Sequence, residues 1–334
     1  MRAKSTSGAA LACVAVLFFA WGFVTSMIDP LVASVRAVFD LSYAEAMLTQ
    51  FAWFIAYGVV SLPTAALLSS KGYTSSILIA IGAMVIGALI IPLATMLDQY
   101  PIVLVGLFVI ASGVTLLQVA ANPLAASLGS PERSHFRLMV TQSFNSLGTV
   151  AGPFLGSAIL LSGGMFAGGA AEAADRNASL RAIDLAFFGI GGLFLVLGVF
   201  VWLTRQRINA VAPGQSPASP LSAFRSGWAL FGALAIFLYV GAEVAIGSML
   251  TLFLHQDYIL GLPLEGAGKL VSLYWFAALI GRFAGVGLLT RVNPSLLLLT
   301  FAGAASALCV AVTQMNGPMA GYLALSIGFF NSIM

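Results

Sequence analysis

The chain has 334 residues, of which 60% are hydrophobic and 7% are charged, and its formal net charge is +3. A soluble domain carries about 25% charged residues, and a soluble chain with so few would expose large apolar patches and aggregate. Composition therefore excludes an ordinary soluble protein, and the small, dispersed positive charge excludes a nucleic-acid partner. It predicts an all-α integral membrane protein whose main surroundings are the lipid bilayer.

Apolar runs long enough to cross a membrane recur along the whole chain, each with about 20 mostly apolar residues. The first run is longer than the core of a secretory signal, about 7–15 residues, so we interpret it as a spanning helix. Ser42 and Glu45 form a capping-box pattern before the second run, and Pro101 and Pro318 stand where a helix start tolerates proline. The ten predicted spans are 9–35, 44–68, 74–96, 102–128, 137–162, 183–204, 228–254, 266–290, 295–314 and 318–334.

A long polar connection with three prolines and two glycines divides these spans into six and four. It predicts an N-terminal six-helix half over 1–204, a cytoplasmic central loop over 205–227, and a C-terminal half over 228–334. Transporters built of two pseudo-symmetric halves have their central loop in this position. Because the last run stops in mid-helix, we expect the second half to be incomplete, with two more apolar segments in the full-length protein.

The basic residues indicate the orientation. If the N-terminus is cytoplasmic, the inner loops hold Arg2, Lys4, Lys71, Arg133, Arg137, Arg205, Arg207, Arg225 and Arg291. The outer loops then hold only Arg36, Arg176, Arg181 and Lys269. Since cytoplasmic loops carry the excess of lysine and arginine, we expect the N-terminus to be cytoplasmic.

Three ionisable residues stand out inside the apolar runs, away from the polar ends, where such groups are costly and mark functional sites. Asp29 directly precedes Pro30, and proline removes a backbone hydrogen bond and opens the helix. Glu243 lies midway along the seventh run, and Arg282 lies in the eighth. Since desolvation penalises the charged form of a buried carboxyl, Asp29 and Glu243 are candidate carriers of a coupling proton. The alternative is a structural ion pair, for example with Arg282, which is itself a candidate for gating or structure.

Uncharged polar and aromatic residues recur at helical spacing in three other runs. Amides offer the donors and acceptors that sugar hydroxyls need, and an aromatic face can stack on a sugar. The alternative is that these amides join helices to one another. Pro123, which follows Asn122, is expected to bend its helix. The candidates for substrate binding are Gln50, Trp53 and Tyr57 in the second span, Gln118 and Asn122 in the fourth, and Gln142 and Asn145 in the fifth.

Patterns for other chemistry are weak. Cys13 and Cys309 both lie within apolar runs and offer neither a disulfide framework nor a metal-binding pair, and His135 and His255 form no metal-binding motif. There is no phosphate-binding loop. We therefore expect no metal, no cofactor and no enzymatic activity. A membrane enzyme acting on lipid-linked sugars would need a polar constellation at the membrane surface, for which only residues 132–135 are available; a sugar sensor with a transporter fold is a further alternative.

Taken together, several motifs resemble the fucose–galactose–glucose:proton symporter family of the major facilitator superfamily. The likeness covers nearly the whole chain and is nearest to its bacterial glucose/galactose transporter branch. The motifs are Phe19–Phe23 followed by Asp29, Phe39–Ala46, Leu116–Pro123, Gln142–Gly148, Tyr239–Glu243, Gly281–Phe283 and Phe330–Met334.

This resemblance implies twelve helices, alternating access, and uptake of a hexose driven by a cation gradient, usually of protons. Sodium is the alternative coupling ion, and we expect a monomer in the bacterial inner membrane. A related sugar such as fucose or N-acetylglucosamine is an alternative. Fucose symporters use one acid in helix 1 and one in helix 4. Asp29 matches the first, but Gln118 stands in the place of the second, so we expect Glu243 to take over its role. Asn331, in the last matching segment, is a further candidate for substrate binding.

Overall fold

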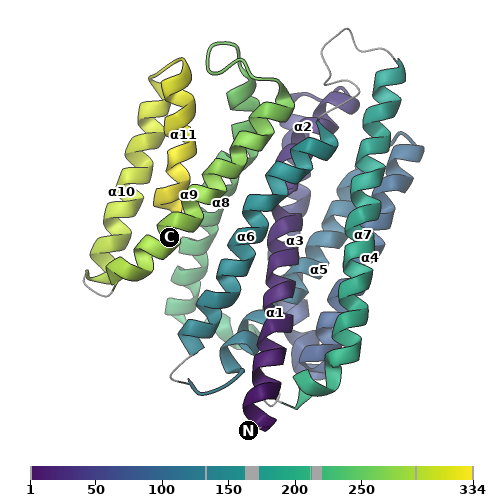
Figure 1. Ribbon diagram of the computed structural model, residues 1–334, viewed down its shortest axis with the longest axis vertical. Helices are drawn as coiled ribbons and strands as arrows, with labels where there is room; N and C mark the ends of the chain where they lie inside the picture. The colour runs from purple at the N-terminus through teal and green to yellow at the C-terminus, as the bar shows by residue number, and fades with distance from the viewer. Residues whose placement is uncertain are drawn as a thin grey trace. The chain divides into compact units, whose positions relative to one another are not determined.

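The computed structural model describes residues 2–131, 134–161, 173–210, 212, 220–289 and 292–332. They form two compact units, each described here by itself. Unit 1 comprises residues 1–21, 39–145 and 180–231, and unit 2 comprises 22–38, 146–179 and 232–334. The predicted division at the 205–227 loop stays a prediction. The helices, labelled in Figure 1, are α1 (Arg2–Ser26), α2 (Ile28–Val38), α3 (Tyr43–Lys71), α4 (Tyr73–Met96), α5 (Tyr100–Ser127), α6 (Ser134–Leu160), α7 (Ala173–Asn209), the short η3 (Pro220–Arg225), α8 (Gly227–His255), α9 (Leu264–Leu289), α10 (Pro294–Thr313) and α11 (Pro318–Asn331).

In the described residues, each of the ten predicted spans is helical, and α1 and α2 share the first. Among the described residues, seven helical segments are long and apolar enough to cross a membrane, judged by length and hydropathy alone. The largest difference is α7, which begins at Ala173 instead of residue 183. Its first turns, before residue 183, are polar, and Arg176 in them donates to the Val38 carbonyl at 2.9 Å. Further along α7, Asp184 accepts a hydrogen bond from Thr95 at 2.5 Å. Hydropathy detects only the apolar part of such a helix.

The first span is interrupted at Met27, between α1 and α2. Pro30 has no N–H to donate to the carbonyl of Ser26 four residues earlier, and its ring clashes with that carbonyl in a straight helix. The hydroxyl of Ser26 bonds to the carbonyls of Gly22 at 2.9 Å and Phe23 at 3.2 Å. The predicted opening of this helix at Pro30 is therefore confirmed.

The predicted helix starts are also confirmed. The Glu45 N–H donates to the Ser42 hydroxyl at 3.2 Å, and the Ser42 N–H donates to the Glu45 carboxylate at 2.8 Å, which together make the capping box of α3. Pro101 lies in the first turn of α5 and Pro318 begins α11. Each of these residues satisfies or avoids a backbone donor that a helix N-terminus leaves unbonded.

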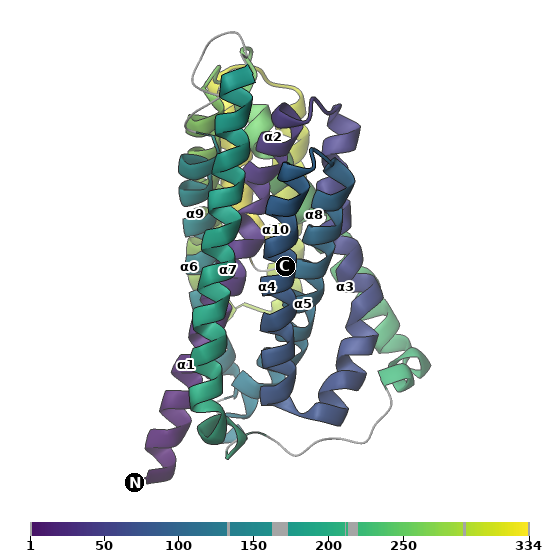
Figure 2. The same cartoon turned by 90° about the vertical axis from the view of Figure 1, so that its right-hand side faces the viewer.

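Close packing of α5 against α4 forms the core of unit 1, where α3 also packs on α5 (Figure 2). Glycines allow the backbones of α4 and α5 to approach each other closely. A β-carbon at Gly87 would lie 2.7 Å from the backbone nitrogen of Ile110, and one at Gly113 would lie 2.6 Å from the Ala80 carbonyl oxygen. Small residues are how helices in a bilayer reach one another, because lipid supplies no hydrophobic force between them.

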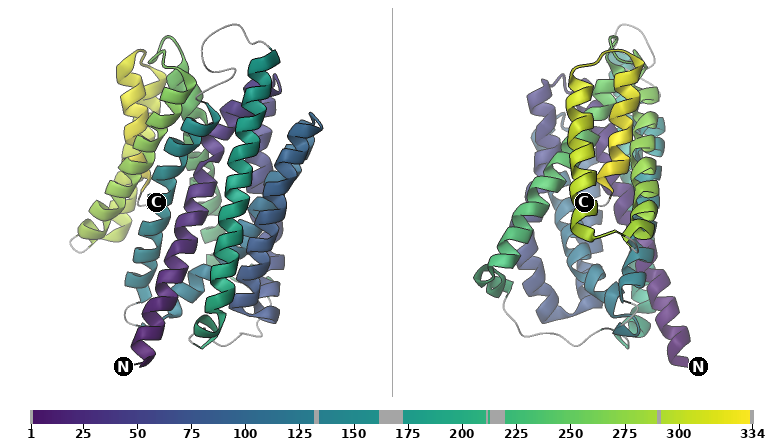
Figure 3. Two further views of the ribbon diagram at one scale, coloured as in Figure 1. Left: turned by 45° about the vertical axis from the view of Figure 1, so that its right-hand side comes forward. Right: turned by 90° about the vertical axis from the view of Figure 1, so that its left-hand side faces the viewer.

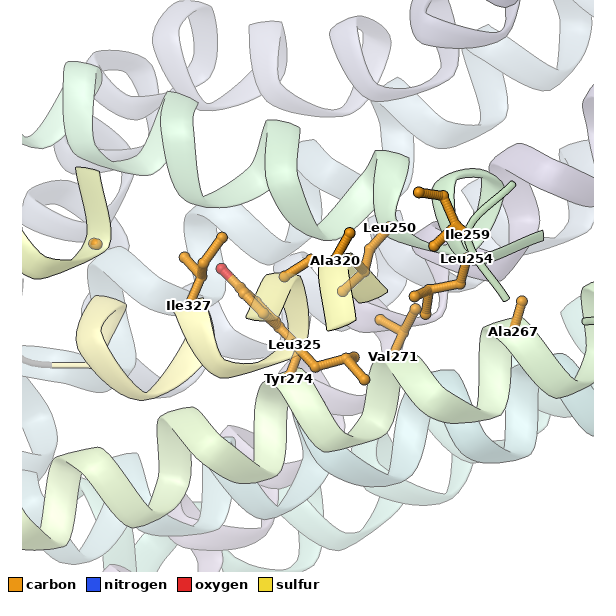
Figure 4. Close-up of a cluster of buried hydrophobic side chains, with 11 residues drawn as sticks. Leu250, Leu254, Ile259, Ala267, Val271, Tyr274, Ala320, Leu325 and Ile327 are labelled. Atoms are coloured by element: carbon orange, nitrogen blue, oxygen red, sulfur yellow. The ribbon is translucent and has the colours of Figure 1, made fainter. Parts of the chain in front are cut away.

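Unit 2 repeats this arrangement with α11 packed on α9 and α10, seen at the right of Figure 3. Here a β-carbon at Gly328 would collide with the backbone carbonyl of Tyr274. Around this crossing lies an apolar cluster that includes side chains of α8, α9 and α11 (Figure 4). Its members are Leu250, Leu254, Ile259, Ala267, Val271, Tyr274, Ala305, Ala320, Ala324, Leu325 and Ile327.

Candidate functional site

Within unit 1, two of the predicted sugar-binding residues meet across α3 and α5. The amide nitrogen of Gln118 on α5 donates a hydrogen bond of 2.9 Å to the hydroxyl of Tyr57 on α3. Both side chains are partly buried. Tyr57 also stacks on Phe54, with ring centroids 5.7 Å apart. The contact joins an amide, which has both a donor and an acceptor group, to an aromatic hydroxyl.

The same face of α3 carries two buried donors without a partner among the described residues. These are the amide nitrogen of Gln50 and the indole nitrogen of Trp53, whose side chains are 5% and 1% exposed. By contrast, the hydroxyl of the neighbouring Thr49 bonds to the Tyr100 hydroxyl at 3.1 Å. Because an unbonded buried donor costs about 1–3 kcal/mol, two of them one turn apart are a feature to be explained by function.

The remaining predicted amides differ in their surroundings. Asn145 of α6 is buried and donates to the Phe18 carbonyl of α1 at 3.1 Å, so at least this amide joins helices. Gln142 is partly buried. On α5, Asn122 is partly buried, and the helix continues past the exposed Pro123 to Ser127.

In unit 2, the predicted acid Glu243 lies on α8 beside an aromatic hydroxyl and a cation. Tyr239, one turn earlier on α8, lies within hydrogen-bonding reach of the Glu243 carboxyl, and the Arg282 guanidinium of α9 attracts that carboxyl electrostatically. Arg282 also donates to the hydroxyl of Ser146 on α6. Arg282 is thus directed toward polar partners from two helices.

Asn331 of α11 joins this group to two tyrosines. The Tyr239 hydroxyl donates to the backbone carbonyl of Asn331 at 2.8 Å, and the Asn331 amide nitrogen donates to the Tyr274 hydroxyl of α9 at 2.7 Å. Asn331 is 4% exposed and Tyr274 is fully buried. The residues Tyr239, Glu243, Tyr274, Arg282 and Asn331 are called the α8–α9–α11 cluster below.

The backbone of Asp29 lies in α2, but its side chain lies outside the described residues. The surrounding segment is held against α6. A β-carbon at Gly152 would lie 2.6 Å from the Phe23 carbonyl oxygen, and one at Gly156 would lie 2.9 Å from Cγ of Pro30. Because these two glycines, four residues apart, have no β-carbon, α6 can approach the interrupted helix closely.

The predicted residues therefore form two groups. Gln50, Trp53, Tyr57 and Gln118 are in unit 1, and Glu243, Arg282 and Asn331 are in unit 2. Sequence reasoning missed Tyr239, Tyr274 and Ser146. Tyr239 could have been found from its place one turn before Glu243, whereas the other two lie far from Glu243 in sequence and only the fold brings them near.

Comparisons with known proteins identify the fold and the family. The profile of the Major Facilitator Superfamily matches residues 11–334. The glucose/galactose transporter of Brucella abortus is 38% identical over 98% of this chain and 78% of its own length. The L-fucose-proton symporter of Escherichia coli is 27% identical over 93% of this chain and 74% of its own. The crystal structure of the transporter FucP in its outward conformation superposes with a TM-score of 0.71, at 25% identity over 98% of this chain and 83% of that one. This chain belongs to the Major Facilitator Superfamily.

Proposed function

We propose that the protein imports a hexose of the glucose or galactose type against its gradient, coupled to protons, by alternating access. The relatives that carry most weight are named as glucose/galactose transporters, and the more distant ones as fucose–proton symporters. The observation that carries proton coupling is the place of Glu243 on a spanning helix, with the Tyr239 hydroxyl and the Arg282 guanidinium beside it.

Glu243 suits this role on energetic grounds. Ionisable residues in spanning helices are costly, and they face partners or water pathways where they serve transport. A carboxyl beside both a phenol and a guanidinium has a partner in either protonation state, because it accepts hydrogen bonds when ionised and donates one when protonated. Asp29 is proposed as a second carrier because it lies beside the break in the first span.

Sugar binding is assigned to the polar face of α3 and α5, with Gln142 and Asn331 as further candidates. A hexose hydroxyl would accept from the orphan donors of Gln50 and Trp53 and could exchange bonds with Gln118 and Tyr57. The aromatic rings of Trp53 and Tyr57 offer the apolar surface that sugar binding also needs.

We further propose that the protein is a monomer of the bacterial inner membrane, with a cytoplasmic N-terminus and the 205–227 loop on the same side. The excess of basic residues in the loops assigned to the cytoplasm supports this orientation. A reporter fused within 205–227 should remain inaccessible from outside the cell, and a reporter accessible there would overturn the topology.

Transport by purified protein in liposomes tests the function. Labelled glucose, galactose, fucose and N-acetylglucosamine are offered with and without an imposed pH gradient, and each also with an imposed sodium gradient. We expect glucose or galactose to accumulate only with the pH gradient. Preferential accumulation of fucose, which the likeness to the E. coli symporter favours, would replace the substrate. Accumulation that depends on the sodium gradient would show that sodium, not the proton, is the coupling ion. Sugar binding without transport would indicate a sensor.

A further inference from the structure

Hydrogen bonds at the single residue Asn331 join three helices of unit 2. Its backbone carbonyl accepts from Tyr239 of α8, and its side-chain amide donates to Tyr274 of α9. Since Asn331 itself belongs to α11, any change in the Tyr239 bond acts directly on the attachment of α11 to α8. The attachment of α11 to α9 has an independent partner in Tyr274.

The Tyr239 hydroxyl has two acceptors within reach but only one proton to donate. It bonds to the Asn331 carbonyl at 2.8 Å, and the Glu243 carboxyl lies within hydrogen-bonding reach on the same helix. A phenol donates one hydrogen bond and also accepts. It therefore cannot donate to Asn331 and to Glu243 at the same time.

The protonation state of Glu243 decides between these two arrangements. A protonated carboxyl can donate to the Tyr239 oxygen, which leaves the phenol proton for the Asn331 carbonyl. An ionised carboxylate can only accept, and a hydrogen bond to an ionised acceptor is about twice as strong as one between neutral groups. The phenol proton then turns to Glu243 and leaves the carbonyl of Asn331. No covalent bond breaks at Tyr239, because its proton only changes acceptor.

Among the described residues, the other charged and titratable groups that act on Tyr239 and Glu243 are Arg282 and Tyr274, both on α9. Arg282 remains charged throughout and attracts the carboxylate when Glu243 loses its proton. Tyr274 accepts a hydrogen bond from the side-chain amide of Asn331, not from its backbone carbonyl. Neither offers Asn331 a replacement for the proton that Tyr239 withdraws.

We propose that Tyr239 is a positioning residue that transmits the protonation of Glu243 to α11 through the carbonyl of Asn331. The proposal rests on the proposed proton coupling at Glu243 and names the step by which a proton there changes helix contacts. In a transporter that alternates between two conformations, a ligand acts only through contacts that differ between them. The Tyr239–Asn331 bond is such a contact.

The test compares Tyr239→Phe with the matched variant Tyr274→Phe. Each removes one phenol hydroxyl that bonds to Asn331, but only Tyr239 also faces Glu243. We expect Tyr239→Phe to lose uphill sugar accumulation while keeping equilibrium exchange of sugar. In Tyr274→Phe, by contrast, accumulation should change only by the factor by which equilibrium exchange changes. Equal losses in the two variants, or normal accumulation by Tyr239→Phe, would show that Tyr239 is only a structural link.

Two further measurements keep the proposal separate from the proposed function and from folding. In a Glu243→Gln background, where accumulation is already lost, Tyr239→Phe should abolish the slowing of hydrogen exchange in α11 that we expect of Glu243→Gln alone, because the amide at 243 then has no phenol through which to act. In Glu243→Gln alone, whose amide can donate to Tyr239 as a protonated acid does, hydrogen exchange should slow in α11 and stay unchanged in α10. Unchanged exchange in α11 overturns the inference even if Tyr239→Phe does not fold. Normal accumulation by Glu243→Gln would instead remove the proposed coupling itself.

Discussion

Replacing Gln50 by leucine should change stability and sugar affinity in opposite directions. The Gln50 amide nitrogen has no partner among the described residues and its side chain is 5% exposed. An unsatisfied buried donor costs about 1–3 kcal/mol, whereas an apolar group of similar shape carries no such penalty. The free energy of unfolding should therefore rise by about 1 kcal/mol in Gln50→Leu, and the thermal midpoint in detergent by about 2 °C.

Sugar binding should weaken in the same variant. If a hexose hydroxyl accepts from Gln50, the variant loses one hydrogen bond, worth about 0.5–1.5 kcal/mol. The dissociation constant should then rise by about 2- to 13-fold. Binding is measured by equilibrium exchange or by titration of the purified protein with the transported sugar.

Thr49→Val is the matched control, one residue away on α3. Thr49 is fully buried, and its hydroxyl already bonds to Tyr100 at 3.1 Å. Removing that bond should lower the thermal midpoint and leave the sugar affinity unchanged. If Gln50→Leu also lowers the midpoint and binds sugar as tightly as the parent, the Gln50 amide is a structural group and the assignment of this face to sugar is refuted.

Three further outcomes follow from the structure. Asp29→Asn and Glu243→Gln should each abolish accumulation against a gradient while sugar exchange survives, because an amide cannot exchange a proton; normal accumulation by both would remove protonation from the mechanism. Gly328→Ala should lower stability by about 1–3 kcal/mol, because its β-carbon would collide with the backbone of α9. Gly303→Ala on α10 meets nothing within 4 Å and should leave the melting temperature unchanged. Protease sites inserted in 205–227 should be cut only from the cytoplasmic side.

The helices could be predicted from the sequence because a long apolar run or a proline is a local feature that can be identified without a structure. A run of apolar residues predicted 74–96 and 228–254, and the structure has Tyr73–Met96 and Gly227–His255. The break in the first span follows from the missing N–H of a single proline. The start of α7 was wrong by ten residues because its first turns are polar, and Arg176 in them is held by a tertiary contact with the Val38 carbonyl, which no local pattern contains.

The candidate site was only partly predictable for the same reason. Polar residues within apolar runs stand out one by one, so Glu243, Arg282 and Gln50 could be named without a structure. The sequence could not show which of these residues lack a hydrogen-bond partner, because that depends on how the helices pack. Asn145 donates to a backbone carbonyl, whereas the donors of Gln50 and Trp53 have no partner among the described residues.

The two groups differ in a way that bears on how sugar and proton are coupled. Gln118 is an amide whose nitrogen bonds to Tyr57, so it can bind sugar but cannot carry a proton. Glu243 can carry a proton, but it is surrounded by a phenol and a guanidinium that bond to protein groups rather than by unpartnered donors. Substrate recognition and protonation are therefore assigned to different helices. The two assignments can therefore be tested separately, sugar binding at Gln50 and protonation at Glu243. The bond from Tyr239 to the carbonyl of Asn331 is the contact that we expect the protonation of Glu243 to change.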